Sequence, residues 1–207
     1  MNRLISLAII LLIASCTPYR LIPAGKVEFA DQGTVETPID WNWRPFDIVH
    51  TWTLDGPNLQ EMIFHMGVKD GKTLMEVLDV EAGFHPLLVW FGKVPDEVSF
   101  RFHKRMTEHE IVDLFTASMS KIAGSKVVST QLAPATLGGK PGFRFEYAFT
   151  GKDQVRRKGF GVGAVFDEKL YLIHYVGTEL YYYDRNQADA ERIIQSFTFK
   201  EKDKGKG

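Results

Sequence analysis

Apolar and polar positions alternate along several segments of the chain with the two-residue period of a β-strand. The clearest is 143–149, where Phe143, Phe145, Tyr147 and Phe149 alternate with polar or small residues. The same period, in segments rich in β-branched and aromatic residues, predicts strands over 48–54, 62–68, 126–131, 158–166 and 170–176. A Lys-Asp-Gly-Lys turn at 69–72 predicts a hairpin from 62–68 into 74–80.

Two segments follow the helical period instead. Thr107 and Glu110 match a capping box, and Gly124 supplies a stop, so a helix is expected over 108–123. A second helix is expected from about Asp184, with one apolar face made of Ala190, Ile193, Ile194 and Phe197. Strands, a helix, a run of strands and a final helix predict an α+β fold, in which an antiparallel sheet is flanked by helices.

The first sixteen residues have the pattern of a secretory signal peptide. A basic start is followed by an apolar run of Leu4 to Ile13, which is too short to span a membrane. Ile13-Ala14-Ser15-Cys16 then resembles the bacterial lipobox. The resemblance implies cleavage before Cys16 and its modification with acyl chains such as palmitate. The alternative is an ordinary signal peptide beside a buried free thiol.

The same resemblance gives an expected location in the bacterial cell envelope. Two or three acyl chains hold a protein on a bilayer almost permanently, whereas one binds only marginally. Thr17 stands where enteric lipoproteins kept in the inner membrane carry aspartate. The resemblance therefore implies an outer-membrane anchor, with the domain facing the periplasm.

Composition then divides the rest of the chain. Residues 1–15 are the expected signal peptide, and 16–38, which mix Pro, Gly, Gln and Thr, are expected to form a lipidated N-terminus and tether. Residues 39–199 contain the periodic segments and are expected to fold as a single globular α+β domain. Residues 200–207 lack any apolar side chain and are expected to be a disordered charged tail.

Charge and motifs exclude several classes of function. Twenty-five basic residues against 26 acidic ones leave no surplus for binding nucleic acid. A single cysteine rules out an intramolecular disulfide and a cysteine-rich metal cluster. His109-Glu110-Ile111-Val112-Asp113 resembles a zinc helix, but Asp113 replaces its second histidine, and capping already explains Glu110. No catalytic residue, metal or cofactor is predicted.

Two further sets of residues receive structural interpretations. Gly159, Gly161 and Gly163 alternate inside a strand pattern, which indicates a strand face that a helix approaches closely rather than a phosphate loop. The six histidines are expected to be satisfied, partly buried side chains: His50, His65, His85, His103, His109 and His174. Whether any of them converge across neighbouring strands stays open.

Aromatic residues are frequent, with 15 Phe, 7 Tyr and 4 Trp. Most should lie in the core, but three successive tyrosines must face different directions. Exposed aromatic groups mark surfaces that bind partners or ligands. We expect one such patch to include members of the set Trp41, Trp43, Trp90, Tyr181, Tyr182 and Tyr183.

The carboxyl half carries a resemblance to a known family. Its features are the helix at 108–123, the Leu-Gly-Gly-Lys-Pro-Gly segment at 137–142 before an aromatic strand, the apolar segment 169–176, and the tyrosines 181–183 before a helix ending near Phe197. Over about 105–199 these resemble the Mog1/PsbP-like α/β/α sandwich. Members with known roles bind or stabilise other proteins, in photosystem assembly and nuclear transport, and share no catalytic centre. The resemblance therefore implies a non-catalytic binding or assembly role.

These observations combine into one leading hypothesis and two alternatives. The leading one is a membrane-anchored envelope lipoprotein that binds a protein or an apolar ligand and is not an enzyme. One alternative is a metal-dependent or serine-type hydrolase of envelope polymers, which convergence of histidines with an acid in a cleft would favour. The other is a periplasmic lipid carrier, which requires an internal apolar cavity.

Overall fold

The computed structural model describes residues 19–30, 32–44, 49–56, 58–74 and 101–200. Cys16, the predicted strand 74–80 beyond its first residue, Trp90 and the tail 201–207 lie outside these ranges. Within them, no helix is both long and apolar enough to cross a membrane.

The main element is an eight-stranded antiparallel sheet with the order β1-β4-β5-β6-β10-β9-β8-β7. Its strands are β1 (Arg20–Ile22), β4 (Trp41–Arg44), β5 (His50–Leu54), β6 (Gln60–Val68), β7 (Val128–Leu137), β8 (Lys140–Thr150), β9 (Arg156–Phe166) and β10 (Lys169–Thr178). Sequential strands β7 to β10 are joined by short turns, as the alternating segments predict.

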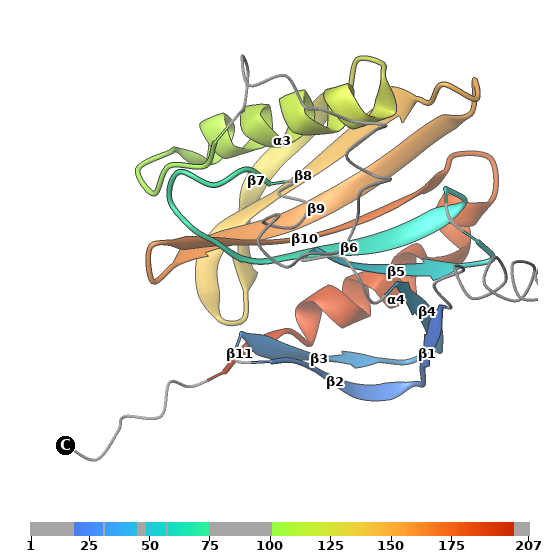
Figure 1. Cartoon of the computed structure of the whole chain (residues 1–207), viewed down its shortest axis with the longest axis horizontal. Helices are drawn as coiled ribbons and strands as arrows, with labels where there is room; N and C mark the ends of the chain where they lie inside the picture. Colours follow the sequence, from blue (N-terminus) through green and yellow to red (C-terminus); the bar gives the residue numbers. More distant parts are fainter. Residues whose placement is uncertain (1–18, 31, 45–48, 57, 75–100, 201–207) are drawn as a thin grey trace, which may run out of the picture.

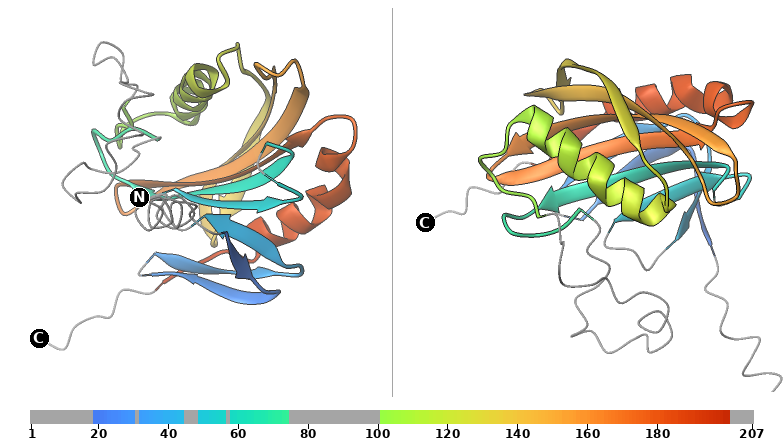
Figure 2. Two further views of the ribbon diagram at one scale, coloured as in Figure 1. Left: turned by 45° about the vertical axis from the view of Figure 1, so that its right-hand side comes forward. Right: turned by 90° about the horizontal axis from the view of Figure 1, so that it is seen from above.

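Helices cover both faces of this sheet. Helix α3 (Glu108–Ala123) packs on β7 and β8, and helix α4 (Tyr182–Gln195) packs on the opposite face, against β6, β9 and β10 (Figures 1 and 2). Each face has its own apolar core, one under α3 around Phe115 and Phe145, and one under α4 around Trp52 and Ile193. The predicted α+β class, with an antiparallel sheet between helices, is confirmed.

The segment expected to be a tether is part of the fold from residue 20 onward, and that expectation is wrong for 20–37. Strands β2 (Gly25–Phe29) and β3 (Gly33–Thr37) pair with each other, and β3 pairs with β11 (Thr198–Phe199). Phe29 and Val35 are buried beside Phe197 in the α4-side core. The strands are short, and β11 is distant in sequence, so no long periodic window reveals them.

The glycine stripe has a different cause from the one expected. Gly159, Gly161 and Gly163 lie opposite Tyr147, Phe145 and Phe143 on the neighbouring strand. A Cβ at Gly161 would lie 2.8 Å from the Phe145 ring, and the other two glycines have equally short contacts with Tyr147 and Phe143. Aromatic rings of β8, rather than a helix, therefore occupy the space above β9.

Both ends of α3 lie where the capping residues in the sequence predict them. The Thr107 side chain accepts a hydrogen bond from the Glu110 backbone, and the Glu110 carboxylate accepts one from Thr107 N at 2.7 Å. This reciprocal pair satisfies two amide groups that the first turn leaves free, and it holds the pKa of Glu110 below its usual value. Gly124 ends the helix in the left-handed conformation, with φ of 63°.

Two strand boundaries differ from the prediction. β7 runs to Leu137 rather than ending at Gln131, because Gln131 takes a positive φ at a register shift and the strand continues beyond it. After the turn at 69–71, Thr73 forms an antiparallel bridge with Arg101, so the chain does not return along β6 at this point. A bulge and a long-range bridge are both invisible to local periodicity.

Adding a methyl group to the stripe tests the contact between the rings and glycines. We expect Gly161→Ala to destabilise the fold by about 1–3 kcal/mol, because the buried Phe145 ring must move. Urea unfolding measures the cost, and the matched comparison is the same change in a Phe145→Leu background. A smaller cost in that background is expected; an equal cost in both would contradict the interpretation.

Candidate functional site

A cleft of about 320 Å³ opens at one end of the main sheet. Four elements meet there: the C-terminal turn of α3, the start of β6, the β8–β9 turn and the end of β10. The volume is at the lower limit of small-molecule sites, which usually measure about 300–1,000 Å³.

The walls of the cleft are apolar. Met119, Ile122 and Ala123 face it from α3, since positions three and four apart lie on one side of a helix. Across from them lie Ile63 of β6, Val176 of β10 and Phe149 of β8. Ile122 remains 50% exposed although its neighbours on the same helix face are in the core. The cleft thus leaves an apolar surface open to a ligand.

Charged groups line its rim. Arg157 is almost buried and binds Asp153 through two hydrogen bonds of 2.9 and 2.6 Å, while its Nε donates to the Asn58 carbonyl at 3.0 Å. These hydrogen bonds hold the pKa of Asp153 well below its usual value. Glu61 and Lys152 also line the cleft, so its charges balance. A balanced rim around apolar walls fits a largely apolar, uncharged or zwitterionic ligand.

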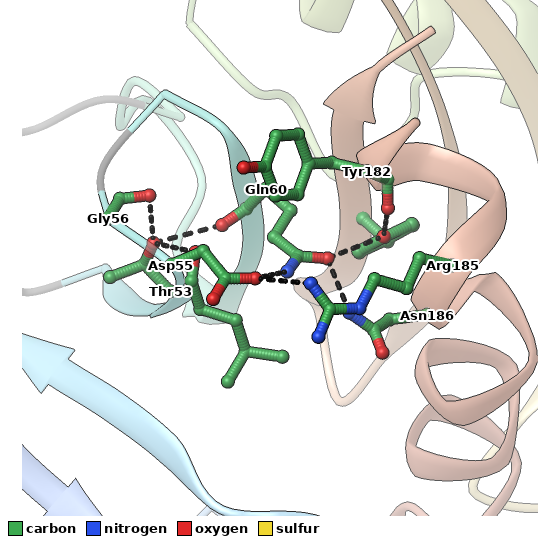
Figure 3. A network of polar contacts seen from close by, with 9 residues as sticks. Thr53, Asp55, Gly56, Gln60, Tyr182, Arg185 and Asn186 are labelled. Atoms are coloured by element: carbon green, nitrogen blue, oxygen red, sulfur yellow. Dashed lines mark hydrogen bonds and ion pairs between the residues drawn. The ribbon is translucent and has the colours of Figure 1, made fainter. Parts of the chain in front are cut away.

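A polar network fixes the wall beside Gln60 (Figure 3). Gln60 Nε2 donates to Asp55 Oδ2 at 3.2 Å, and Gln60 Oε1 accepts from Asn186 at 2.7 Å and from the Tyr175 hydroxyl at 3.2 Å. Arg185 also donates to Asp55, at 3.0 Å. The network joins the β5–β6 turn and the start of β6 to the first turn of α4, so this end of the sheet is fixed against α4.

One row further into the core, two histidines converge. His65 of β6 and His174 of β10 stack with ring centroids 5.3 Å apart and an interplanar angle of 12°. The sequence left open whether any histidines converge, and this pairing becomes visible only through the β6–β10 register, which sets Leu172 opposite His65. Both side chains are fully buried beneath α3.

The partners of these histidines are not carboxylates. His65 Nδ1 lies 2.9 Å from the Leu74 carbonyl, which can only accept, so this nitrogen carries the proton. His174 Nδ1 lies 2.8 Å from the Tyr147 hydroxyl. The Nε2 atom of each ring is buried without a hydrogen-bond partner among the described residues. Burial lowers the pKa of His65 to about 4 and lowers that of His174 well below its usual value, so both rings are neutral near pH 7.

The remaining histidines in the described ranges do not join this pair. His50 is half-buried, with its ring 4.9 Å from that of Phe29, and His103 lies at the surface beside Asp70. His109 and Asp113, which resemble part of a zinc helix, are both exposed on α3. Within the ranges that the structure describes, no three His, Cys, Asp or Glu side chains are placed to hold a metal ion.

The described members of the expected aromatic patch lie in different environments. Trp41 and Tyr183 are buried in the α4-side core, and Trp43 packs against that core. Tyr181 is exposed and Tyr182 half-buried, with their rings 5.0 Å apart at the start of α4. Trp90 lies outside the described residues. The expectation is therefore wrong for Trp41 and Tyr183, because aromatic residues of several elements fill the space between the main sheet, α4 and the small sheet formed by β2, β3 and β11.

The cleft contains residues that sequence reasoning did not select. Ile122 continues the apolar spacing of α3, and its position in the last turn is the one signal in the sequence that it could remain exposed. Asp153 lies in the β8–β9 turn and Arg157 at the start of β9, in a polar segment with no recognisable motif. Their placement depends on β6, which is almost a hundred residues away in sequence and supplies the opposite wall.

Comparison with known proteins bears on the fold. No family model matches the sequence, and no curated protein matches it either. Among solved structures, the cyanobacterial PsbP protein CyanoP of Synechocystis matches 89% of this chain and 94% of its own, with 12% identity and a TM-score of 0.50. LpqN of Mycobacterium tuberculosis, described as involved in cell envelope biogenesis, matches 88% and 92%, with 11% identity and a TM-score of 0.44. The likeness to CyanoP shows that the chain has a PsbP-like fold.

The buried histidines predict a specific pH dependence of stability. Their pKa values are lower in the folded chain than the usual 6.5, so the unfolded chain binds more protons below that pH and stability falls as pH falls. We expect His65, with its pKa of about 4, to contribute a loss of about 2 kcal/mol between pH 7 and pH 5, and His174 to add a loss of the same sign, measured by urea unfolding.

Single substitutions test which histidines cause this pH dependence of stability. His65→Asn should make the loss between pH 7 and pH 5 smaller, whereas His109→Gln, at an exposed position, should leave it unchanged. A pH dependence that is the same in all three proteins would show that the buried pair is not its source.

Proposed function

We propose that the chain is a membrane-anchored lipoprotein of the bacterial envelope whose domain binds an apolar or amphiphilic ligand, or an apolar segment of a partner protein, without catalysing a reaction. The observation that carries this proposal is the open cleft between α3 and the sheet, with apolar walls and a rim of balanced charge. The lipobox-like sequence at 13–16 supports the anchor.

The chemistry of the cleft supports binding rather than hydrolysis. Arg157 and Asp153 neutralise each other through paired hydrogen bonds, which leaves neither as a free acid or base. The converging histidines lie in the core rather than in the cleft lining, and their hydrogen-bond partners are a carbonyl and a phenol. A general base needs access to the proton that it removes. A binding role makes use of the groups that do reach the cleft.

The first prediction from this proposal concerns the anchor. Replacing Cys16, the only cysteine of the chain, with Ala should block acylation and leave an unprocessed precursor or a species without acyl mass. Intact-mass measurement of the protein from membranes and from the soluble fraction gives the result. A Cys16→Ala protein with unchanged mature mass and membrane retention would contradict the anchor.

The second prediction concerns the cleft. Ile122→Glu places a charge on its apolar wall and should weaken ligand binding by about 1.5–3 kcal/mol, or roughly 10- to 100-fold in Kd. Native mass spectrometry of protein extracted gently from its own envelope should show a reproducible additional mass on the unsubstituted chain that Ile122→Glu loses.

Val128→Glu is the matched control. Val128 is 49% exposed, close to the 50% of Ile122, and does not line the cleft. The control should retain the additional mass. Binding in the cleft would be contradicted if all three proteins carried the additional mass equally, or if the unsubstituted chain carried none.

A further inference from the structure

The distance along the chain from the proposed anchor to the fold is short. Tyr19 follows Cys16 by three positions, and β1 begins at Arg20. Three residues span at most about 11 Å when fully extended. The polar headgroup layer on each side of a bilayer is about 5–8 Å thick. A lipid on Cys16 therefore leaves β1 almost no freedom to move away from the membrane surface.

The surface of β1 suits such a position. β1 is an edge strand of the main sheet, where β4 is its one hydrogen-bonded neighbour among the described strands. Leu21 is 65% exposed and Tyr19 is 40% exposed. Tyrosine is enriched where membrane and water meet, because its ring is apolar and its hydroxyl remains hydrated. The two side chains therefore present apolar surface at the point where acyl chains on Cys16 would hold the domain to the bilayer.

The charged side chains of the first strands carry no net charge that would oppose or drive contact with a bilayer. Arg20 and Lys26 are matched in number by Glu28 and Asp40, and all four side chains are exposed. The Arg20 guanidinium lies 5.9 Å from the centroid of the Trp43 ring, and Lys26 forms an ion pair with Glu28 at 3.6 Å. The surface is thus suited to the polar–apolar boundary of a bilayer rather than to strong electrostatic attraction.

We propose that Tyr19, directly before β1, and Leu21 on β1 form a membrane-docking face that holds the domain edge-on against the lipid bilayer. This inference rests on the proposed acylation of Cys16. The cleft is lined from β6 onward, three strands away from β1 or about 14 Å along the sheet. Helix α3, which forms one wall of the cleft, lies on the opposite face of the main sheet from β2 and β3 (Figure 1). Docking through β1 therefore leaves the cleft accessible from the aqueous side.

A depth measurement on the acylated full-length protein tests this proposal. Acylation consumes the thiol of Cys16, so Leu21→Cys and Leu180→Cys each introduce a single reactive thiol for an NBD fluorophore. Leu180 is the matched control because it is wholly exposed and follows β10, away from the β1 edge. Both proteins are reconstituted in vesicles of phosphatidylethanolamine and phosphatidylglycerol, with and without a doxyl-labelled lipid.

The expected result is strong quenching by the doxyl lipid at position 21, with a blue-shifted emission, and little quenching at position 180. Equal quenching at both positions, or none at 21, would overturn the docking face. Protection of position 21 from a water-soluble quencher without quenching by the doxyl lipid would identify a protein contact instead, and would also overturn it.

Intact mass separates this failure from failure of the anchor. Acylated protein without quenching at position 21 rejects the docking face and keeps the lipoprotein proposal. Protein without acyl mass would carry a second label on Cys16, and would reject the anchor and the docking face together.

Discussion

The contact between the aromatic rings of β8 and the glycines of β9 is the constraint on which the rest of the structure depends. Phe143, Phe145 and Tyr147 need space on the α3 face, and the absence of side chains at Gly159, Gly161 and Gly163 provides it. The rings then form the surface on which Phe115 of α3 packs, with centroids 4.9 Å from Phe145 and from Tyr147. The position of α3 follows from this contact, and with it one wall of the cleft.

The two faces of the sheet consequently differ in how completely they are covered. The α4 face is closed by the helix, by the small sheet and by large rings such as Trp41 and Trp52, which are fully buried. The α3 face is closed over the two histidines but open at the end of the helix, where Ile122 reaches solvent. The polar network around Gln60 joins the start of β6 to the β5–β6 turn and to α4, so the wall of the cleft beside Gln60 is held from the α4 side.

The parts of the fold that local physics determines could be predicted from the sequence. Thr107, Glu110 and Gly124 define the ends of α3, and the alternation from Phe143 defines the face of β8. Long-range pairing could not be predicted. β3 pairs with β11, which is more than 160 positions away, and the segment expected to be a tether therefore contains strands. The cleft was missed for the same reason, because Ile122, Arg157 and Ile63 become neighbours only when three distant segments meet.

We infer that this cleft is where the domain binds its ligand. The most direct measurement is methyl NMR of the folded domain, labelled at Ile and Met, during addition of lipid-containing and lipid-free extracts of its own envelope. Ile63, Met119 and Ile122 line the cleft, while Met62 and Ile193 lie in the α4-side core and serve as references. We expect chemical-shift changes at the methyl groups of Ile63, Met119 and Ile122 that saturate with added extract. Changes confined to the reference residues, or spectra that stay the same with both extracts, would contradict it.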